Sequence, residues 1–149
     1  MPSPKTSTDP ALQLDNQLCF ALYSASLAMT KLYKPVLEAL GLTYPQYLAM
    51  LVLWERDGLM VSELGERLFL DSGTLTPLLK RLEAAGLVAR IRALDDERRV
   101  HVTLTAAGRK LKTRAAKVPS AILQATQCPT ADVVSLTRQV QALRQRLTA

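Results

Sequence analysis

Cysteine and histidine are scarce in this sequence of 149 residues, which holds two cysteines and one histidine. Cys19 and Cys128 lie far apart and form no Cys-x-x-Cys motif. This argues against a zinc site, which needs three or four clustered ligands, and against a disulfide scaffold. Because free thiols persist in a reducing compartment, we expect a cytoplasmic protein with no metal and no cofactor.

Hydrophobic runs long enough to span a bilayer are also absent. The apolar run from Leu18 to Met29 is too short, and it follows two aspartates and a single lysine, unlike a secretory signal. Three prolines with several serines and threonines predict a flexible tail over residues 1–10. The length and a hydrophobic content of 48% suit one globular domain with no membrane partner.

A surplus of basic residues gives the chain a net charge of +6, but this surplus is local. Residues 61–105 hold seven basic and seven acidic side chains, whereas the chain from Arg109 onward holds eight basic residues and only Asp132 as an acid. Five of these eight lie between Arg109 and Lys117, either as a solvated helix face or as phosphate contacts. A case for nucleic-acid binding therefore rests on pattern and not on net charge.

An amphipathic helix with a glycine stop occupies the middle of the chain. Its apolar stripe recurs every three or four residues: Leu75, Leu78, Leu79 and Leu82. Its other face carries side chains that can bond base edges and phosphates: Thr74, Thr76, Lys80 and Arg81. Gly86 is a C-terminal cap, and Pro77 places the start of the helix nearby, with Asp71, Ser72 or Thr74 as the N-terminal cap. A shorter helix over residues 63–68, opened by Val61 and Ser62, precedes it.

Two alternating segments follow and predict a hairpin. In residues 87–92 the alternation puts Leu87, Ala89 and Ile91 on one side, and in residues 100–104 it puts Val100, Val102 and Leu104 on one side. The linker, residues 94–97, is acidic and flanked by arginines. Together with the two helices, this hairpin predicts a winged helix-turn-helix, a mainly α fold with a small β-hairpin wing, and DNA as the partner.

The acidic tip of this hairpin needs an explanation, because carboxylates repel phosphate. An economical role for Asp96 is to hold Arg98 in one rotamer by a charge-assisted hydrogen bond, so that the guanidinium enters the minor groove. The alternative is a solvated charged turn.

The run from Asp96 to Thr105 resembles the D-x-R-x-x-x-V-x-L-T wing signature of MarR-type winged-helix regulators, and residues 70–83 resemble their recognition helix. The resemblance implies a homodimer whose Arg98 enters the minor groove while the helix after Asp71 reads the major groove. The DNA-binding residues that it implies are Asp71, Ser72, Thr74, Thr76, Pro77, Lys80, Arg81, Asp96, Arg98 and Arg99. One MarR-type domain (1–149) would then comprise a winged-helix region (43–105) and a helical dimerisation region (12–40 and 106–149).

Apolar periodicity predicts the helices on either side of the winged-helix region. The first runs over residues 12–40 and is ended by Gly41, and the next starts with a Thr43–Gln46 capping box, with Pro45 in its first turn, and runs to Asp57. The last helix, begun by Thr130, carries an apolar seam: Val133, Leu136, Val140, Leu143 and Leu147.

The helix before the last, from about Ala106, also offers an apolar face: Leu111, Ala115, Val118 and Ile122. We expect a second subunit to cover both faces in an intertwined helical dimer, with an intramolecular helix as the alternative. A two-fold dimer would place its recognition helices about 34 Å apart on a near-palindromic operator.

A polar stripe on the first helix contains a thiol: Cys19, Tyr23, Ser26, Thr30 and Tyr33. Hydroxyl donors would favour the thiolate, the form that attacks a peroxide, and the alternative is an inert buried cysteine. Residues 14–25 resemble the organic hydroperoxide regulator (OhrR) branch of the MarR family, which implies a sensor cysteine at Cys19 bonded to Tyr33 and Tyr44. Because Cys19 and Tyr33 lie about 21 Å apart along one helix, the tyrosines must come from the other subunit.

Cys128 precedes Pro129 in the predicted turn before the last helix. The resemblance to two-cysteine members implies that Cys19, oxidised to a sulfenic acid, forms a disulfide with Cys128 of the partner subunit, and that this releases DNA. A spectator surface thiol is the alternative. The predicted function is a redox-sensing repressor, not an enzyme, with an organic hydroperoxide as inducer.

Two rival functions share some of these features. A MarR-type repressor released by a reversible aromatic ligand could hold that ligand in a dimer-interface pocket lined by Tyr33, Tyr44, Tyr47 and Trp54. A thiol peroxidase would use the same Cys19 chemistry but would have no need of a wing. The lone His101 has no paired acid in the sequence pattern that would make it catalytic.

Overall fold

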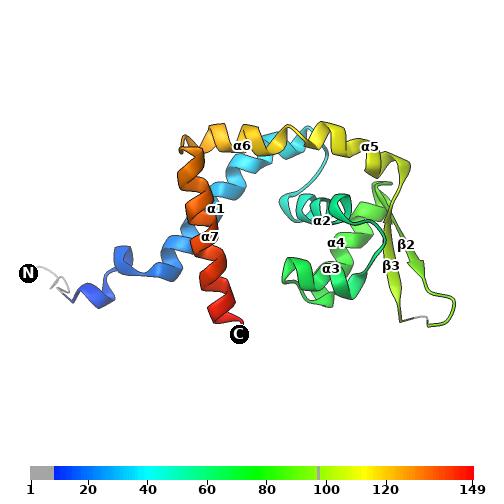
Figure 1. Cartoon of the computed structure of the whole chain (residues 1–149), viewed down its shortest axis with the longest axis horizontal. Coiled ribbons are helices and arrows are strands. Elements are labelled where there is room, and N and C mark those ends of the chain that lie inside the picture. The colour runs from blue at the N-terminus through cyan, green and yellow to red at the C-terminus, as the bar shows by residue number, and fades with distance from the viewer. Residues whose placement is uncertain (1–8, 97) are drawn as a thin grey trace, which may run out of the picture.

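The computed structural model describes residues 9–96 and 98–149. Two short 3₁₀ helices, η1 (Pro10–Leu12) and η2 (Leu14–Asn16), are followed by α1 (Leu18–Glu38), α2 (Tyr44–Glu55), β1 (Leu59–Met60), α3 (Val61–Leu68), α4 (Ser72–Ala84), β2 (Val88–Arg92), β3 (Val100–Leu104), α5 (Ala106–Ala115), α6 (Val118–Thr126) and α7 (Thr130–Leu147). In Figure 1, α2, α3, α4 and the strands form one lobe, and most of α1, α6 and α7 lie at the opposite end of the molecule. The predicted fold class, mainly α with a small β wing, is confirmed.

The chain before α1 differs from the prediction of one helix over residues 12–40. Two 3₁₀ helices replace the first turns of that helix, because amide side chains take up backbone carbonyls of residues 10 and 11. Asn16 Nδ2 donates to the Pro10 carbonyl at 2.9 Å, and Gln17 Nε2 donates to the Ala11 carbonyl at 2.8 Å. The predicted flexible tail falls largely on residues 1–8, which lie outside the described residues. Its last residue, Pro10, already belongs to η1.

The boundary between α1 and α2 follows the sequence signals. Gly41 has a φ of +71°, and the capping box is formed: the Gln46 N–H donates to Thr43 Oγ1 at 3.3 Å, and the Thr43 N–H donates to Gln46 Oε1 at 3.0 Å. Helix α2 ends at Glu55, before the predicted Asp57. The Asp57 carboxylate instead accepts from the N–H of Gly58 and of Leu104, both at 2.8 Å, and so anchors the loop to β3.

The two helices of the helix-turn-helix are α3 and α4. The predicted stripe of α4 is buried at Leu75, Leu78, Leu79 and Leu82, and Gly86 follows with a φ of +76°. Asp71 is the N-terminal cap, because its Oδ1 accepts from the Thr74 N–H at 2.7 Å. Pro77 lies inside the helix and not at its start. Because proline has no N–H, it removes one backbone hydrogen bond of the helix.

The strands form an antiparallel sheet in the order β1-β3-β2. The hairpin pairs Val88 with Leu104 and Arg92 with Val100. The sequence predicted this hairpin but not β1, a two-residue strand that pairs Leu59 with Val102. In β2 the core-facing residue is Val88, at 2% exposure, whereas Ile91 is 54% exposed. The side of β2 that faces the core is therefore the side of Val88, and not the side that carries Ala89 and Ile91.

The helices after the sheet correct one expectation. The single helix predicted from about Ala106 is two helices, α5 and α6, and their apolar residues are buried within the chain: Leu111, Ala115, Val118 and Ile122. The cover comes from the same chain because α5 packs on α2 and α6 packs on α1. Helix α7 has no buried residue, and its predicted seam includes Leu136 at 61% and Leu147 at 74% exposure. No helix in the described part of the chain is long and apolar enough to cross a membrane.

Candidate DNA interface and candidate redox site

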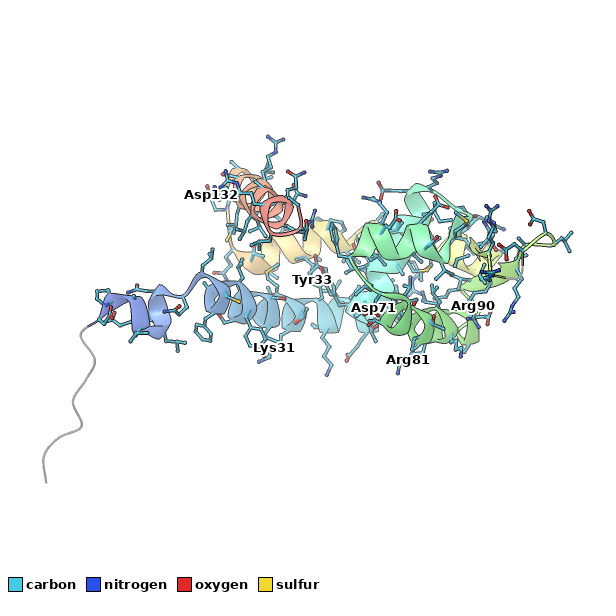
Figure 2. All side chains as sticks on the ribbon, turned by 90° about the horizontal axis from the view of Figure 1, so that it is seen from below. Lys31, Tyr33, Asp71, Arg81, Arg90 and Asp132 are labelled. Carbon is cyan, nitrogen blue, oxygen red and sulfur yellow. The ribbon has the colours of Figure 1, made fainter. Side chains whose placement is uncertain are left out.

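Helix α4 presents the predicted polar face to solvent. Thr74, Lys80 and Arg81 are exposed and Thr76 is half-buried, because the leucine stripe fixes the rotation of the helix. Figure 2 shows Asp71 at the start of α4 and Arg81 further along it. The hydrogen bonds from Thr74 hold the pKa of Asp71 below its usual value. The Asp71 carboxylate is therefore charged, and it caps the N-terminus of α4.

The wing differs in one detail from the prediction for Asp96 and Arg98. Asp96 Oδ1 accepts from the backbone N–H of Arg98 at 3.0 Å, whereas the Arg98 Nε lies 3.8 Å away, beyond hydrogen-bond length. The Arg98 side chain is 96% exposed. The expected charge-assisted bond that fixes its rotamer is therefore not made in the unbound protein. Asp96 fixes the backbone of the turn instead, and the guanidinium extends into solvent.

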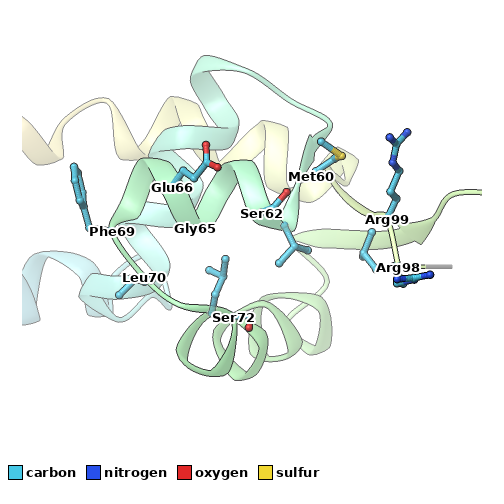
Figure 3. A pocket seen from close by; sticks show the side chains of 12 residues that line it. Met60, Ser62, Gly65, Glu66, Phe69, Leu70, Ser72, Arg98 and Arg99 are labelled. Atoms are coloured by element: carbon cyan, nitrogen blue, oxygen red, sulfur yellow. The ribbon is translucent and has the colours of Figure 1, made fainter. Parts of the chain in front are cut away.

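The wing and the start of α4 share one surface. A cavity of about 590 Å³ lies between them, with walls from β1, α3, α4 and β3: Met60, Val61, Ser62, Gly65, Glu66, Phe69, Leu70, Ser72, Leu75, Arg98, Arg99 and Val100. Figure 3 shows Arg98 and Arg99 diverging at one end of this hollow and Phe69 at the other end. Three of the predicted DNA-binding residues, Ser72 of the helix and Arg98 and Arg99 of the wing, thus line the same cavity.

One pair in this lobe was missed by sequence reasoning. The Glu83 carboxylate, in the last turn of α4, accepts from the backbone N–H and from Nη2 of Arg90 in β2, both at 3.1 Å. The bond from the Arg90 guanidinium, and to a smaller extent the bond from its backbone N–H, hold the pKa of Glu83 below its usual value. In sequence only the seven-residue spacing across Gly86 marks the pair, and that spacing is too common to be a signal.

The two cysteines are free and exposed. Cys19 is the second residue of α1, and Cys128 lies between α6 and α7. Within one chain, none of the described side chains donates a hydrogen bond to the sulfur of Cys19, and Thr30 Oγ1 donates to carbonyls of its own helix. The hydroxyl lining from a second subunit stays a prediction. The hydroxyl side chains of the stripe lie along one face of α1. Ser and Thr hydroxyls on a helix donate to backbone carbonyls of the preceding turn more readily than to side chains on the same face.

Tyr33 and Tyr44 are brought together although they belong to different helices. Their ring centroids lie 4.8 Å apart, and the Tyr47 ring lies 6.0 Å from Tyr33. Figure 2 shows Tyr33 and Lys31 on opposite sides of α1. Burial raises the pKa of Tyr33 and of Tyr44, and for Tyr33 the neighbouring tyrosines add to the effect. Both hydroxyls are therefore protonated and can donate hydrogen bonds at neutral pH.

A cavity of about 450 Å³ opens beside these two tyrosines. It lies between α1, the start of α2 and α7, and its lining is Ser26, Met29, Thr30, Tyr33, Tyr44, Leu136, Thr137, Val140, Gln141 and Arg144. Of the four aromatic residues predicted to line a ligand pocket at a dimer interface, Tyr33 and Tyr44 line this cavity. Tyr47 is buried, and Trp54 Nε1 donates to the Gly108 carbonyl at 2.9 Å. In the described chain no group of three or more His, Cys, Asp or Glu side chains is placed to hold a metal.

A helix-turn-helix, an exposed polar face on its second helix and an arginine-tipped wing together define a winged-helix DNA-binding protein. Comparison with known proteins places the chain more closely. Residues 31–115 match the family described as Transcriptional regulator SarA/Rot. The chain is 48% identical to the organic hydroperoxide resistance transcriptional regulator of Bacillus subtilis (strain 168), over 91% of this chain and 92% of that protein.

Solved structures give the same result. Reduced AbfR bound to DNA superposes with a TM-score of 0.78 at 33% identity, covering 96% of this chain and all (100%) of that one. Disulfide-formed AbfR superposes with a TM-score of only 0.61 at 37% identity, covering 93% and 92%. The chain belongs to the MarR-type winged-helix transcriptional regulators, in the branch of the organic hydroperoxide resistance regulators. The family resemblance seen in the sequence is confirmed.

Proposed function

We propose that a homodimer of this chain is a repressor that binds a near-palindromic operator when reduced and leaves it when an organic hydroperoxide oxidises Cys19. The observation that carries the proposal is the separation of thiol and hydroxyl donors. Cys19 and Tyr33 stand at opposite parts of α1, about 21 Å apart along its axis, so a subunit cannot complete this site alone.

Exposed apolar side chains support the dimer. The start of the chain and α1 expose Leu12, Leu14, Leu18 and Leu27, and α7 exposes Leu136, Val140 and Leu147. A monomer rarely leaves so much apolar surface in water, and a second copy of the chain is the natural cover. In such a dimer the start of one α1 enters the cavity beside Tyr33 and Tyr44 of the other chain.

The chemistry at Cys19 begins with the thiolate. The sulfur attacks the terminal oxygen of the hydroperoxide, the O–O bond breaks, and the alkoxide takes a proton and leaves as an alcohol. The product is a sulfenic acid on Cys19. The two protonated tyrosine hydroxyls are suited to donate hydrogen bonds to the thiolate, which favours the reactive form.

The second step is a condensation. The thiolate of Cys128 of the partner subunit attacks the sulfenic sulfur, the S–S bond forms, and hydroxide leaves and takes a proton to become water. The exposed position of Cys128 between two helices supports this role. The chain superposes less closely on disulfide-formed AbfR, with a TM-score of 0.61, than on reduced, DNA-bound AbfR, with a TM-score of 0.78, and this supports a conformational change on disulfide formation. A reducing thiol reverses the step.

A gel shift on DNA from upstream of the protein's own gene tests the proposal. The reduced protein should bind, and an organic hydroperoxide should release the DNA at roughly one equivalent per Cys19, reversibly with dithiothreitol. Cys19→Ser should bind and ignore the oxidant. Release from Cys19→Ser would show that Cys19 is not the sensor. Release by an aromatic acid without oxidant would favour a ligand-controlled repressor, and sustained peroxide turnover would favour a thiol peroxidase.

A further inference from the structure

We propose that Glu83 and Arg90 are positioning residues for DNA recognition: they join the recognition helix to the wing, so that major-groove and minor-groove contacts are made by one rigid unit. This inference rests on the DNA-binding part of the proposed function and not on its redox part. Neither residue is among the ten for which the sequence predicts DNA contact.

The geometry of the pair fixes a strand and not only a side chain. Oε2 of Glu83 accepts from the backbone N–H of Arg90, and Oε1 accepts from Nη2 of the same residue, both at 3.1 Å. One carboxylate thus holds both the main chain and the side chain of Arg90. Because Glu83 is in the last turn of α4 and Arg90 is in the middle of β2, the strand cannot slide or rotate relative to the helix.

From Arg90 the constraint continues to the tip of the wing through hydrogen bonds. Arg90 is paired with Val102, and the ladder ends where Arg92 meets Val100. Beyond it the Ala93 N–H donates to the Arg99 carbonyl at 2.8 Å. The turn is closed by the backbone bond from Arg99 to Asp96 at 3.0 Å and by the bond from the Arg98 N–H to the Asp96 carboxylate. The backbone of Arg98 is therefore tied to α4, although its side chain is 96% exposed and meets Asp96 only as an ion pair at 3.8 Å.

Stability alone does not account for the pair. Nε of Arg90 is buried and has no hydrogen-bond partner, and an unsatisfied buried donor costs free energy. A partly buried ion pair is often no better than two packed apolar residues, and its attested value is to select one geometry. The other short pair of the lobe, Arg67 with Glu55 at 2.6 Å, is well exposed and links no DNA-contacting elements. It provides a matched control.

A double-mutant cycle on operator affinity tests the proposal. In the wild-type background Arg98→Ala should weaken binding about tenfold, the cost of a lost groove contact. In the Glu83→Gln background the same change should cost less than about threefold, because the wing no longer holds Arg98 in the groove. In the Glu55→Gln background the cost should remain about tenfold. A general loss of stability would lower all affinities but would leave the cost of Arg98→Ala unchanged.

The outcomes separate the ideas. An equal cost of Arg98→Ala in the wild-type and Glu83→Gln backgrounds would overturn the positioning role, and so would a negligible cost in the wild type. If Glu83→Gln does not fold, as judged by circular dichroism, Arg90→Met removes the Nη2 bond and leaves the backbone bond to Glu83, so the cost of Arg98→Ala in that background should fall below its wild-type value without being abolished. A wild-type protein that binds no operator would instead overturn DNA binding itself, and the inference with it.

Discussion

The close approach of α5 to the root of the wing makes Gly108 the most informative residue for a stability test. A Cβ at this position would overlap with the carbonyl oxygen of Leu87. The Gly108 carbonyl accepts from Trp54 Nε1, so the same residue also joins α5 to α2. Because the clash is with backbone and not with the end of a flexible side chain, Gly108→Ala requires α5 to move.

Two other helical glycines give a graded comparison. A Cβ at Gly65 would lie 2.8 Å from the Leu70 carbonyl oxygen, and at Gly73 it would lie 3.5 Å from Asp71 Oδ1, an ordinary contact. Alanine gains up to about 1 kcal/mol over glycine in a helix, and forcing extra atoms into a packed site costs about 1–3 kcal/mol or more. We expect Gly108→Ala to cost about 3 kcal/mol, Gly65→Ala about 1 kcal/mol, and Gly73→Ala to stabilise by up to about 1 kcal/mol.

Urea unfolding at one fixed protein concentration measures these changes, since the stability of a dimer depends on concentration. With a slope of about 2 kcal/mol per molar, Gly108→Ala should lower the midpoint by about 1.5 M and leave the slope unchanged. A smaller loss for Gly108→Ala than for Gly65→Ala would refute the reasoning, because the closer backbone contact must cost more. Destabilisation by Gly73→Ala would refute the free-energy gain expected from replacing glycine by alanine in a helix.

Three further predictions concern the candidate sites. Arg98→Ala should weaken operator binding about tenfold in an anisotropy titration, and an unchanged affinity would exclude a wing contact. Cys128→Ser should still sense hydroperoxide but leave Cys19 open to overoxidation or mixed disulfides; non-reducing mass spectrometry that finds Cys19 protected would contradict a resolving role. Burial, then Tyr44 and Tyr47, raise the pKa of Tyr33 above its ordinary 10.0, so stability from its protonated hydroxyl is present below pH 10 and lost above it. Tyr33→Phe should therefore lose less stability than the wild type between about pH 8 and pH 11 in urea unfolding.

Local signals predicted the elements well where a single residue decides the backbone. The Thr43 and Gln46 capping box and the left-handed glycines at the ends of α1 and α4 are read from short stretches of sequence, because each satisfies orphan groups within a few residues. The leucine stripe of α4 is equally local. The start of the chain was predicted less well, because the side chains of Asn16 and Gln17 bond carbonyls six residues away and replace the first helical turns.

The candidate site was predictable only in part. The exposed face of α4 and the hairpin follow from periodicity, and the roles of Cys19 and Cys128 come from family resemblance and stay predictions. Burial of the α5 and α6 faces within the chain was only the alternative to cover by a second subunit, because an apolar stripe does not specify which surface covers it. The aim of the Asp96 carboxylate at a backbone N–H, and not at the Arg98 guanidinium, depends on the path of the turn.

The sequence by itself determined the periodicities, the Thr43–Gln46 capping box, the hairpin and the family, because these depend on neighbours within one or two turns of chain. It left three candidates for the N-terminal cap of α4, and the structure selects Asp71. Only the tertiary structure decided which groups meet across elements: Glu83 with Arg90, Tyr33 with Tyr44, and Gly108 against the Leu87 carbonyl. These contacts depend on the rotation and packing of whole helices. They are set by the shared burial of many side chains, and no short segment carries that information.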